Sequence, residues 1–215
     1  MTVNLKNRIV TSIFLILLTI LILSFDFLLI YTLIVLGVIS ILEFLSLTNK
    51  IFKNKKFIFI FNFFFITYIS LFSFFFIFFS NFVHLKIIIF SLLIACIGSD
   101  IGGYIVGKYF KGPKLTKISP NKTISGSIGS FVFSSVLLSL FIFYFTENLN
   151  FKFILIGLIT SLFCQFGDLI FSFLKRKAKL KDTGNILPGH GGVLDRIDGI
   201  LIGIPFGFLS IILLF

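Results

Sequence analysis

The sequence has little charge, little proline and almost no cysteine. Of its 215 residues 13% are charged, 4 are Pro, 2 are Cys and none is Trp. Cys96 and Cys164 both lie inside apolar runs, which excludes a disulfide-stapled secreted domain and predicts two small buried residues. The scarcity of charge also excludes a disordered chain.

Apolar residues are abundant instead. Hydrophobic residues make up 58% of the chain, 34 residues are Phe, and the mean hydropathy is +1.15. A helix needs about 20 apolar residues to cross a bilayer, so this chain has room for several spans but not for an independent soluble domain. The predicted fold class is an all-α polytopic membrane protein.

Charge-poor runs predict about seven transmembrane helices. They lie at 9–25, 27–49, 57–83, 87–107, 127–146, 153–174 and 199–215. The first run follows Lys6 and Arg8, as the apolar core of a signal peptide would, but no small-residue cleavage site comes after it. We therefore expect a membrane span here rather than a cleaved leader.

The basic residues alternate between the two sides of the predicted helices. All 19 Lys and Arg residues except Lys86 and Lys152 lie near the N-terminus or in every second connection, at 50–56, 108–122 and 175–198. The positive-inside rule then predicts a cytoplasmic N-terminus and an active site that faces the cytoplasm, in the cytoplasmic (inner) membrane. Topology and anionic lipid headgroups account for the net charge of +11, so no nucleic-acid partner is expected.

We expect two regions along the chain. Residues 1–83 would form the first three helices, and residues 84–215 a catalytic transmembrane region with cytoplasmic loops at 108–122 and 175–198. These two loops hold three of the four Pro residues and many of the Gly residues. Chemistry is therefore expected there rather than in the short outer loops.

Two carboxylates are predicted at membrane depth. Asp100 and Asp168 each lie inside an apolar run, eight and seven residues before the next basic residue. An ionised Asp in a bilayer costs on the order of 2.5 to 3.5 kcal/mol, so both need partners. One interpretation is that each Asp forms an ion pair with a lysine. The other is that Asp100 and Asp168 line a polar cavity that opens to the cytoplasm and holds a cation.

A second pair of carboxylates begins the last span. Asp195 and Asp198 are three residues apart in LDRID, which on a helix places them on one face. Oxygen ligands in a small cluster suit Mg²⁺, which keeps waters and phosphate oxygens in its shell. Two such residues alone are also typical of a solvated helix start. Glu43 is interpreted as a helix-end residue.

Glycines and basic residues precede this pair. The segment KDTGNILPGHGG, residues 181–192, combines Lys181 and Asp182 with Gly189, His190 and Gly191. Glycines let backbone N–H groups approach a ligand and form an anion-binding concavity. No P-loop or dinucleotide fingerprint is present. His190 is predicted as a phosphate ligand or acid–base group rather than a structural residue.

The other basic loop leads into the fifth span. Its ISPNKT stretch, residues 118–123, presents the side chains of Ser119, Asn121, Lys122 and Thr123. A helix N-terminus beside a lysine predicts a phosphate site. Phosphate-seeking groups on two loops, together with several carboxylates, favour metal-assisted phosphoryl or nucleotidyl transfer. Gly199, Gly203 and Gly207 in the last span predict a close helix contact instead.

The second half of the chain resembles a known family. The segment from Ser172 to Asp198, SFLKRKAKLKDTGNILPGHGGVLDRID, is similar to the signature of the phosphatidate cytidylyltransferases, or CDP-diglyceride synthases. The stretches QFGDL at 165–169, SDIGGYIVGK at 99–108 and ISPNKT at 118–123 extend the resemblance. It covers roughly residues 95–205.

The resemblance implies the reaction of CTP with phosphatidic acid to give CDP-diacylglycerol and pyrophosphate, with Mg²⁺ as cofactor. It implies that Asp168, Asp195 and Asp198 bind metal and act in catalysis with His190. Around the substrates it implies a set of polar and basic side chains: Asp100, Lys122, Lys175, Arg176 and Arg196.

Other functions stay open on the sequence alone. A CTP-dependent lipid kinase would share the basic loops and the metal but transfer the γ-phosphate. A cation-coupled transporter would also carry intramembrane acids, although these would be expected at the midplane. Membrane lipid is a partner in each case, and the sequence leaves a homodimer open.

Overall fold

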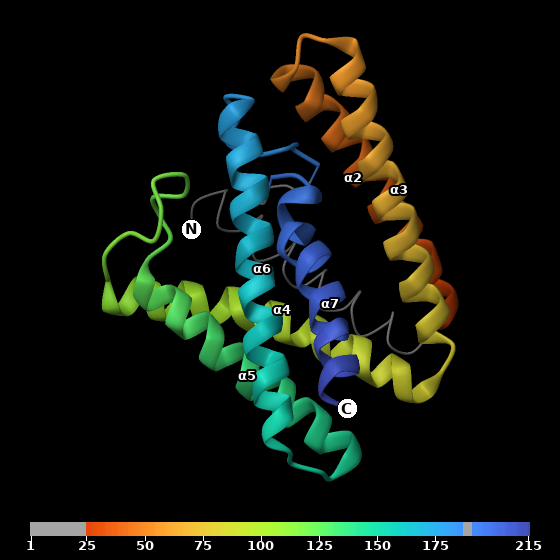
Figure 1. Ribbon diagram of the computed structural model, residues 1–215, viewed down its shortest axis with the longest axis vertical. Helices are drawn as coiled ribbons and strands as arrows, with labels where there is room; N and C mark the ends of the chain where they lie inside the picture. The colour runs from red at the N-terminus through yellow and green to blue at the C-terminus, as the bar shows by residue number, and fades with distance from the viewer. Residues whose placement is uncertain (1–24, 187–190) are drawn as a thin grey trace, which may run out of the picture. The chain divides into compact units, whose positions relative to one another are not determined.

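A computed structural model describes residues 25–186 and 191–215 of the chain. The described residues form six α-helices and one isolated antiparallel bridge between Lys114 and Thr123. The helices are α2 (Asp26–Ile51), α3 (Lys55–Ser80), α4 (Val83–Phe110), α5 (Ile124–Thr146), α6 (Phe151–Lys177) and α7 (Leu194–Leu214) (Figure 1).

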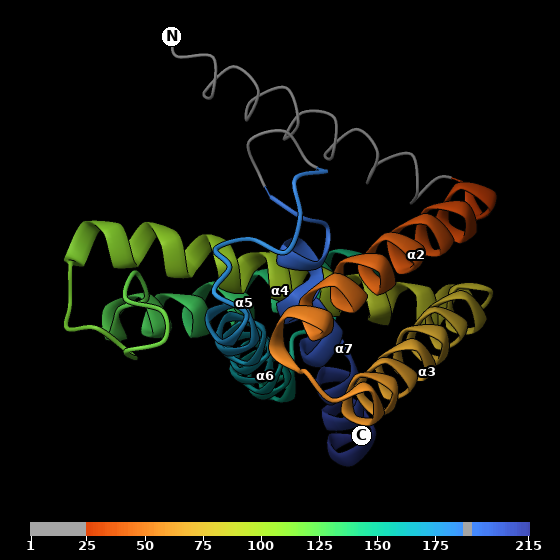
Figure 2. The ribbon, with the colours of Figure 1, turned by 90° about the horizontal axis from the view of Figure 1, so that it is seen from above.

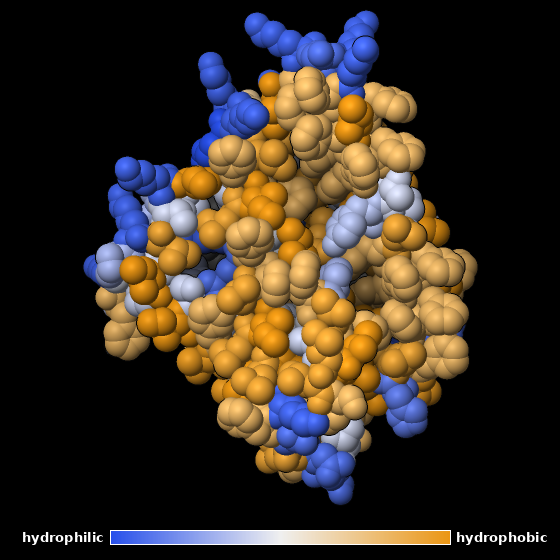
Figure 3. Space-filling view, viewed as in Figure 1, coloured by the Kyte–Doolittle hydropathy of each residue, from blue (hydrophilic) through white to orange (hydrophobic). Residues whose placement is uncertain are grey.

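All six helices are long and apolar enough to cross a membrane. They coincide with the second to seventh predicted spans, so the prediction of an all-α integral membrane protein is confirmed for the described residues. The first predicted span, 9–25, lies outside the described residues except for Phe25. Figure 3 shows a face covered mainly by apolar side chains, as expected where lipid is the solvent.

The contacts of the chain divide it into two units. The first unit comprises Met1–Asn81 and Leu174–Ile197, and the second comprises Phe82–Phe173 and Asp198–Phe215. The predicted division of the chain after residue 83 stays a prediction.

In the first unit α2 and α3 lie side by side as a helical hairpin (Figures 1 and 2). Asn54 caps α3, because its side chain accepts a hydrogen bond from the N–H of Lys56 at 2.9 Å. The rings of Phe44 and Phe65 stack with centroids 3.8 Å apart. Beside them, Thr48 donates to Asn62 Oδ1 at 2.8 Å, which satisfies a buried amide oxygen.

In the second unit α4 packs closely against α5 because the facing residues are small. A Cβ added at Gly102 would meet the Gly129 carbonyl oxygen and the Phe133 ring. One added at Gly126 would lie 2.8 Å from the Gly103 carbonyl oxygen. Glycines at such a crossing let two backbones approach in a membrane, where van der Waals packing replaces the hydrophobic effect.

The predicted glycine contact of α7 is confirmed within the same unit. A Cβ at Gly203 would lie 2.8 Å from Cys96 Sγ on α4, and one at Gly207 would meet Leu92 Cδ2 at 2.7 Å. Cys96 and Cys164 are fully buried, as predicted, and remain free thiols. Small residues therefore set the distances between the helices that carry the polar groups.

Candidate active site

The basic loop before α5 is folded back on itself. Pro120 and Asn121 occupy the centre of a turn in which the Lys122 N–H donates to the Ser119 carbonyl at 3.0 Å, a position where Pro is favoured. The Leu115 N–H donates to the Lys122 carbonyl at 2.8 Å, and Thr123 caps α5 by accepting from the Gly126 N–H at 3.1 Å. The loop thus presents Lys122 at the start of a helix.

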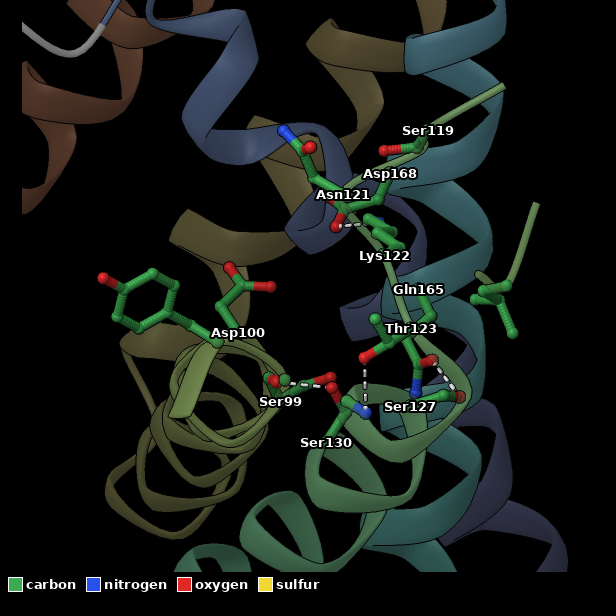
Figure 4. Close-up of a pocket in the computed structure, with 14 residues that line it drawn as sticks. Ser99, Asp100, Ser119, Asn121, Lys122, Thr123, Ser127, Ser130, Gln165 and Asp168 are labelled. Atoms are coloured by element: carbon green, nitrogen blue, oxygen red, sulfur yellow. Dashed lines mark hydrogen bonds and ion pairs between the residues drawn. The ribbon is translucent and has the colours of Figure 1, made fainter. Parts of the chain in front are cut away.

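This loop, α4, α5 and α6 enclose a cavity of about 280 Å³ in the second unit (Figure 4). The polar residues predicted at the start of the fifth span all line it, together with both intramembrane acids: Asp100, Ser119, Asn121, Lys122, Thr123 and Asp168. The predicted cavity lined by Asp100 and Asp168 is therefore present.

Asp168 and Lys122 form an ion pair at this cavity. Lys122 Nζ lies 2.6 Å from Asp168 Oδ2, and the side chains of the pair are 28% and 23% exposed. The two interpretations of the intramembrane acids thus both apply to Asp168, which has a lysine partner and also lines a cavity. Lys122 contacts Oδ2 of Asp168, and the other oxygen, Oδ1, lies near α7. A Cβ added at Gly199 would lie 3.1 Å from Oδ1.

Hydroxyl and amide groups hold the walls of the cavity in place. Ser127 donates to Gln165 Oε1 at 2.5 Å, which ties α5 to α6. Ser130 donates to the Ser99 carbonyl at 2.6 Å, and Ser99 shares a hydrogen bond of 2.9 Å with Ser161. These groups satisfy one another across α4, α5 and α6 and so tie the three helices together around the cavity.

Asp198 lies on α7 where that helix crosses α6. A Cβ at Gly167 would lie 2.7 Å from the Asp198 carbonyl oxygen, so this glycine brings the backbone next to Asp168 close to that of Asp198. Asp198 is 7% exposed, and its Oδ1 accepts the Gly199 N–H at 2.9 Å. Two predicted metal ligands, Asp168 and Asp198, therefore lie on neighbouring segments of the second unit.

The remaining predicted residues belong to the first unit. We call residues 178–193, which connect α6 to α7, the glycine-rich loop. Asp195 Oδ1 lies 2.7 Å from Lys175 Nζ, and Oδ2 accepts the N–H groups of Thr183 at 2.8 Å and Gly192 at 3.0 Å. Asp195, predicted as a metal ligand, thus also holds the two arms of this loop together.

Four other predicted residues lie at the surface. Arg176, Lys181, Asp182 and Arg196 are exposed, and Arg176 donates to the Leu180 carbonyl at 3.2 Å. Gly191 has φ +82° and packs against Asp182 and Asp195, which explains why a glycine is required here. Gly189 and His190 lie outside the described residues.

A metal ion would find hard oxygen donors at the cavity. No group of three or more His, Cys, Asp or Glu side chains in the described part of the chain could hold a metal by itself. Mg²⁺, however, is commonly bound by one or two carboxylates together with waters and substrate phosphates. Asp168 and Asp100, with the surrounding hydroxyl and amide oxygens, fit that requirement.

Sequence reasoning missed several residues of these sites. Ser127, Ser130 and Gln165 line the cavity but were not predicted as site residues. Gln165 was noted only as part of the QFGDL stretch. The interpretation of Glu43 as a helix-end residue is wrong, because Glu43 lies inside α2, eight residues before Ile51. Its side chain bonds to the glycine-rich loop. An acid in an apolar run was the available signal.

Comparisons with known proteins agree with these motifs. The pattern of the cytidylyltransferase family matches residues 3–214. Phosphatidate cytidylyltransferase of Bacillus subtilis (strain 168) is 46% identical over 122 residues, which cover 54% of this chain and 45% of the relative.

Two further relatives carry the same name. That of Staphylococcus aureus (strain COL) is 46% identical over 134 residues, covering 60% of this chain and 50% of the relative. That of Mycobacterium leprae (strain TN) is 41% identical over 114 residues, covering 53% and 36%. The chain thus spans half or less of the length of these relatives.

Proposed function

The chain belongs to the cytidylyltransferase family, and from this premise we propose that it catalyses the reaction of CTP with phosphatidic acid to give CDP-diacylglycerol and pyrophosphate. The observation that carries the proposal is the Lys122–Asp168 pair at a cavity lined by hydroxyl, amide and carboxylate groups. Such a cavity offers positive charge and oxygen ligands to a nucleotide triphosphate at the membrane.

In the proposed reaction a phosphate oxygen of phosphatidic acid attacks the α-phosphorus of CTP. The new P–O bond forms as the bond between the α-phosphorus and its bridging oxygen breaks, and the electron pair leaves with pyrophosphate. Lys122 neutralises charge that develops on the phosphates, and Ser119 and Asn121 donate to their oxygens. No covalent enzyme intermediate is needed.

The glycine-rich loop and its flanks supply the remaining contacts in this proposal. Lys175, Arg176, Lys181 and Arg196 bring positive charge to the substrates, and Asp182, Gly189 and Gly191 shape the loop around them. His190 acts as a phosphate ligand or acid–base group. Asp100 lies with Asp168 on the cavity wall and orients the nucleotide.

We propose Mg²⁺ as the cofactor and, as the family resemblance implies, the carboxylates Asp168, Asp195 and Asp198 as the residues that would bind it. When bound, the ion would neutralise phosphate charge and act as a Lewis acid. The protein's own part is to hold Asp168 in place through Lys122 and through the close α6–α7 contact at Gly167 and Gly199.

The proposed setting is the cytoplasmic (inner) membrane, with the N-terminus inside and the site facing the cytoplasm. The distribution of basic residues supports this orientation, because all but two of them lie on the predicted inner side. Residues 84–215 form the catalytic region in this proposal. Phosphatidic acid would reach it from the surrounding lipid.

The test uses membranes that contain the protein, phosphatidic acid, Mg²⁺ and CTP labelled in the cytidine. We expect the label to become extractable with lipid, pyrophosphate to be released in equal amount, and EDTA to stop both. Transfer of label from γ-labelled CTP instead would mean a lipid kinase. No transfer of either label by inserted protein would contradict the proposal.

A further inference from the structure

Glu43 is a buried carboxylate to which the proposed reaction steps assign no role. It lies on α2, eight residues before the last residue, Ile51, and is 5% exposed. A buried carboxylate is costly unless its oxygens are hydrogen-bonded. Glu43 therefore needs hydrogen-bond donors, and the position of those donors indicates what the carboxylate holds in place.

The donors to Glu43 come from the glycine-rich loop and the start of α7. Thr183 Oγ1 donates to Oε2 at 2.7 Å, the Leu194 N–H donates to Oε2 at 2.9 Å, and the Val193 N–H donates to Oε1 at 3.0 Å. These donors are 140 to 151 residues away along the chain. One side chain of the hairpin thus bonds to the loop at Thr183 and again at its C-terminal end.

Two glycines of the loop are explained by this carboxylate. A Cβ at Gly192 would meet Glu43 Oε2, and one at Gly184 would come just as close to Oε1. A side chain at either position would collide with the carboxylate in this arrangement. Part of the glycine density that predicts a ligand-binding concavity therefore serves to enclose a side chain of the protein itself.

The carboxylate also occupies the positive end of α7. The first N–H groups of a helix have no partner within it, and they favour negative charge. Here Glu43 accepts from Val193 and Leu194, and Asp195 accepts from Gly192. Substrate phosphates would have to displace these bonds in order to bind at this helix end.

We propose that Glu43 is a positioning residue for the reaction, which fixes the glycine-rich loop and the first turn of α7 in their working conformation. The proposal rests on the proposed function, in which this loop carries substrate-binding groups. Glu43 touches no reacting atom; it acts through Thr183, Val193 and Leu194. The N-terminal hairpin is thereby a part of the catalytic machinery rather than only a membrane anchor.

The first arm of the test measures kinetics. Glu43→Gln keeps the size of the side chain but turns an amide NH₂ toward donors, so at least one of the three hydrogen bonds is lost. We expect kcat to fall about 100-fold, the effect of a small displacement of substrate-binding groups, with a smaller change in KM for CTP. Glu147→Gln is the matched control, because Glu147 is exposed, and it should behave as wild type.

The second arm measures loop motion without any substrate. A nitroxide is attached to a cysteine introduced at Asn185, an exposed loop position, and a second one at Lys56 on α3 as the control. The two native cysteines are 0% exposed and do not compete for the label. We expect Glu43→Gln to sharpen the spectrum of the Asn185 label and to leave the Lys56 label unchanged.

Several outcomes decide the matter. Unchanged mobility at Asn185 in Glu43→Gln would overturn the proposal, as would equal sharpening at both labels, which indicates general loosening. If Glu43→Gln does not insert, Thr183→Val removes one donor and must still sharpen the Asn185 spectrum. If even the wild type transfers no cytidine, the proposed function fails, and the label arm alone decides whether Glu43 fixes the loop.

Discussion

The cavity at Asp168 and the glycine-rich loop both gather carboxylates and lysines, yet they use them differently. In the loop region Asp195 accepts three hydrogen bonds and Glu43 accepts three more, all from the protein. In the cavity Asp168 has one lysine partner beside about 280 Å³ of open volume. The first arrangement stabilises a conformation, and the second leaves groups available to a ligand.

The ion pairs of the two regions also differ in how far their side chains are exposed to solvent. The side chains of Lys175 and Asp195 are 12% and 6% exposed, whereas those of Lys122 and Asp168 are 28% and 23% exposed. A less exposed pair is more costly to break, because the remaining charge has no water to replace its partner. Loss of Lys175 should therefore affect folding first, and loss of Lys122 should affect activity first.

The largest expected effect is that of Asp168→Asn. It removes the carboxylate that pairs with Lys122 and that we propose as a metal ligand. Cytidine transfer should fall on the order of 1,000-fold, while the protein still inserts because an intramembrane charge has been removed. Turnover by this variant at the rate of the Glu147→Gln control would remove Asp168 from the site.

Replacing the two lysines by Met tests the comparison directly. Lys175→Met leaves Asp195 without its charged partner, so the free energy of unfolding should drop by about 1.5 to 3 kcal/mol. Lys122→Met should lower stability less but reduce kcat/KM for CTP about 100-fold. Thermal unfolding in detergent and the label assay measure the two quantities. The reverse ranking of the two variants in stability would contradict the comparison.

The helix contact beneath the cavity is the next test. Gly102→Ala places a methyl group against the Gly129 carbonyl and Phe133, and should destabilise the protein by about 1 to 2 kcal/mol through overpacking. Gly37→Ala is the matched control in the α2–α3 hairpin, where the new Cβ would lie 3.3 Å from Ile69 Cγ2. The two variants should differ clearly in thermal unfolding; equal melting temperatures would argue against a tight α4–α5 contact.

The smallest effect is expected for Ser119→Ala. This residue lines the cavity, and its backbone rather than its side chain makes the turn to Lys122. Loss of one hydroxyl contact should raise KM for CTP about fivefold. Asn185→Ala in the exposed part of the glycine-rich loop should leave KM unchanged. A larger effect at Asn185 than at Ser119 would move the nucleotide from the cavity to the loop.

Much of the cavity was predictable because its parts are local in sequence. Ser119, Asn121, Lys122 and Thr123 belong to one short stretch, and a helix start beside a lysine is a recognisable pattern. Asp100 and Asp168 stood out because carboxylates inside apolar runs require partners. Which lysine would pair with Asp168 was not predictable, since Lys122 is 46 residues away.

Glu43 was the clearest failure of sequence reasoning. Nothing near it along the chain indicates its role, because its three donors follow 140 or more residues later. The same holds for Gly184 and Gly192, whose close neighbour is the Glu43 carboxylate. Hydrogen bonds of such long range depend on how helices pack, which local patterns do not specify.

The sequence by itself determined that this protein lies in a lipid bilayer and that its spans are helices. Long apolar runs require a bilayer, and in a bilayer the backbone must satisfy its own hydrogen bonds, so every such run within the described residues is a helix. Only the tertiary structure decided which carboxylates face a cavity and which are bound by the protein's own donors. The physical reason is that apolarity and length are properties of single segments, whereas the pairing of Asp168 with Lys122 and of Glu43 with Thr183 requires contacts between distant ones.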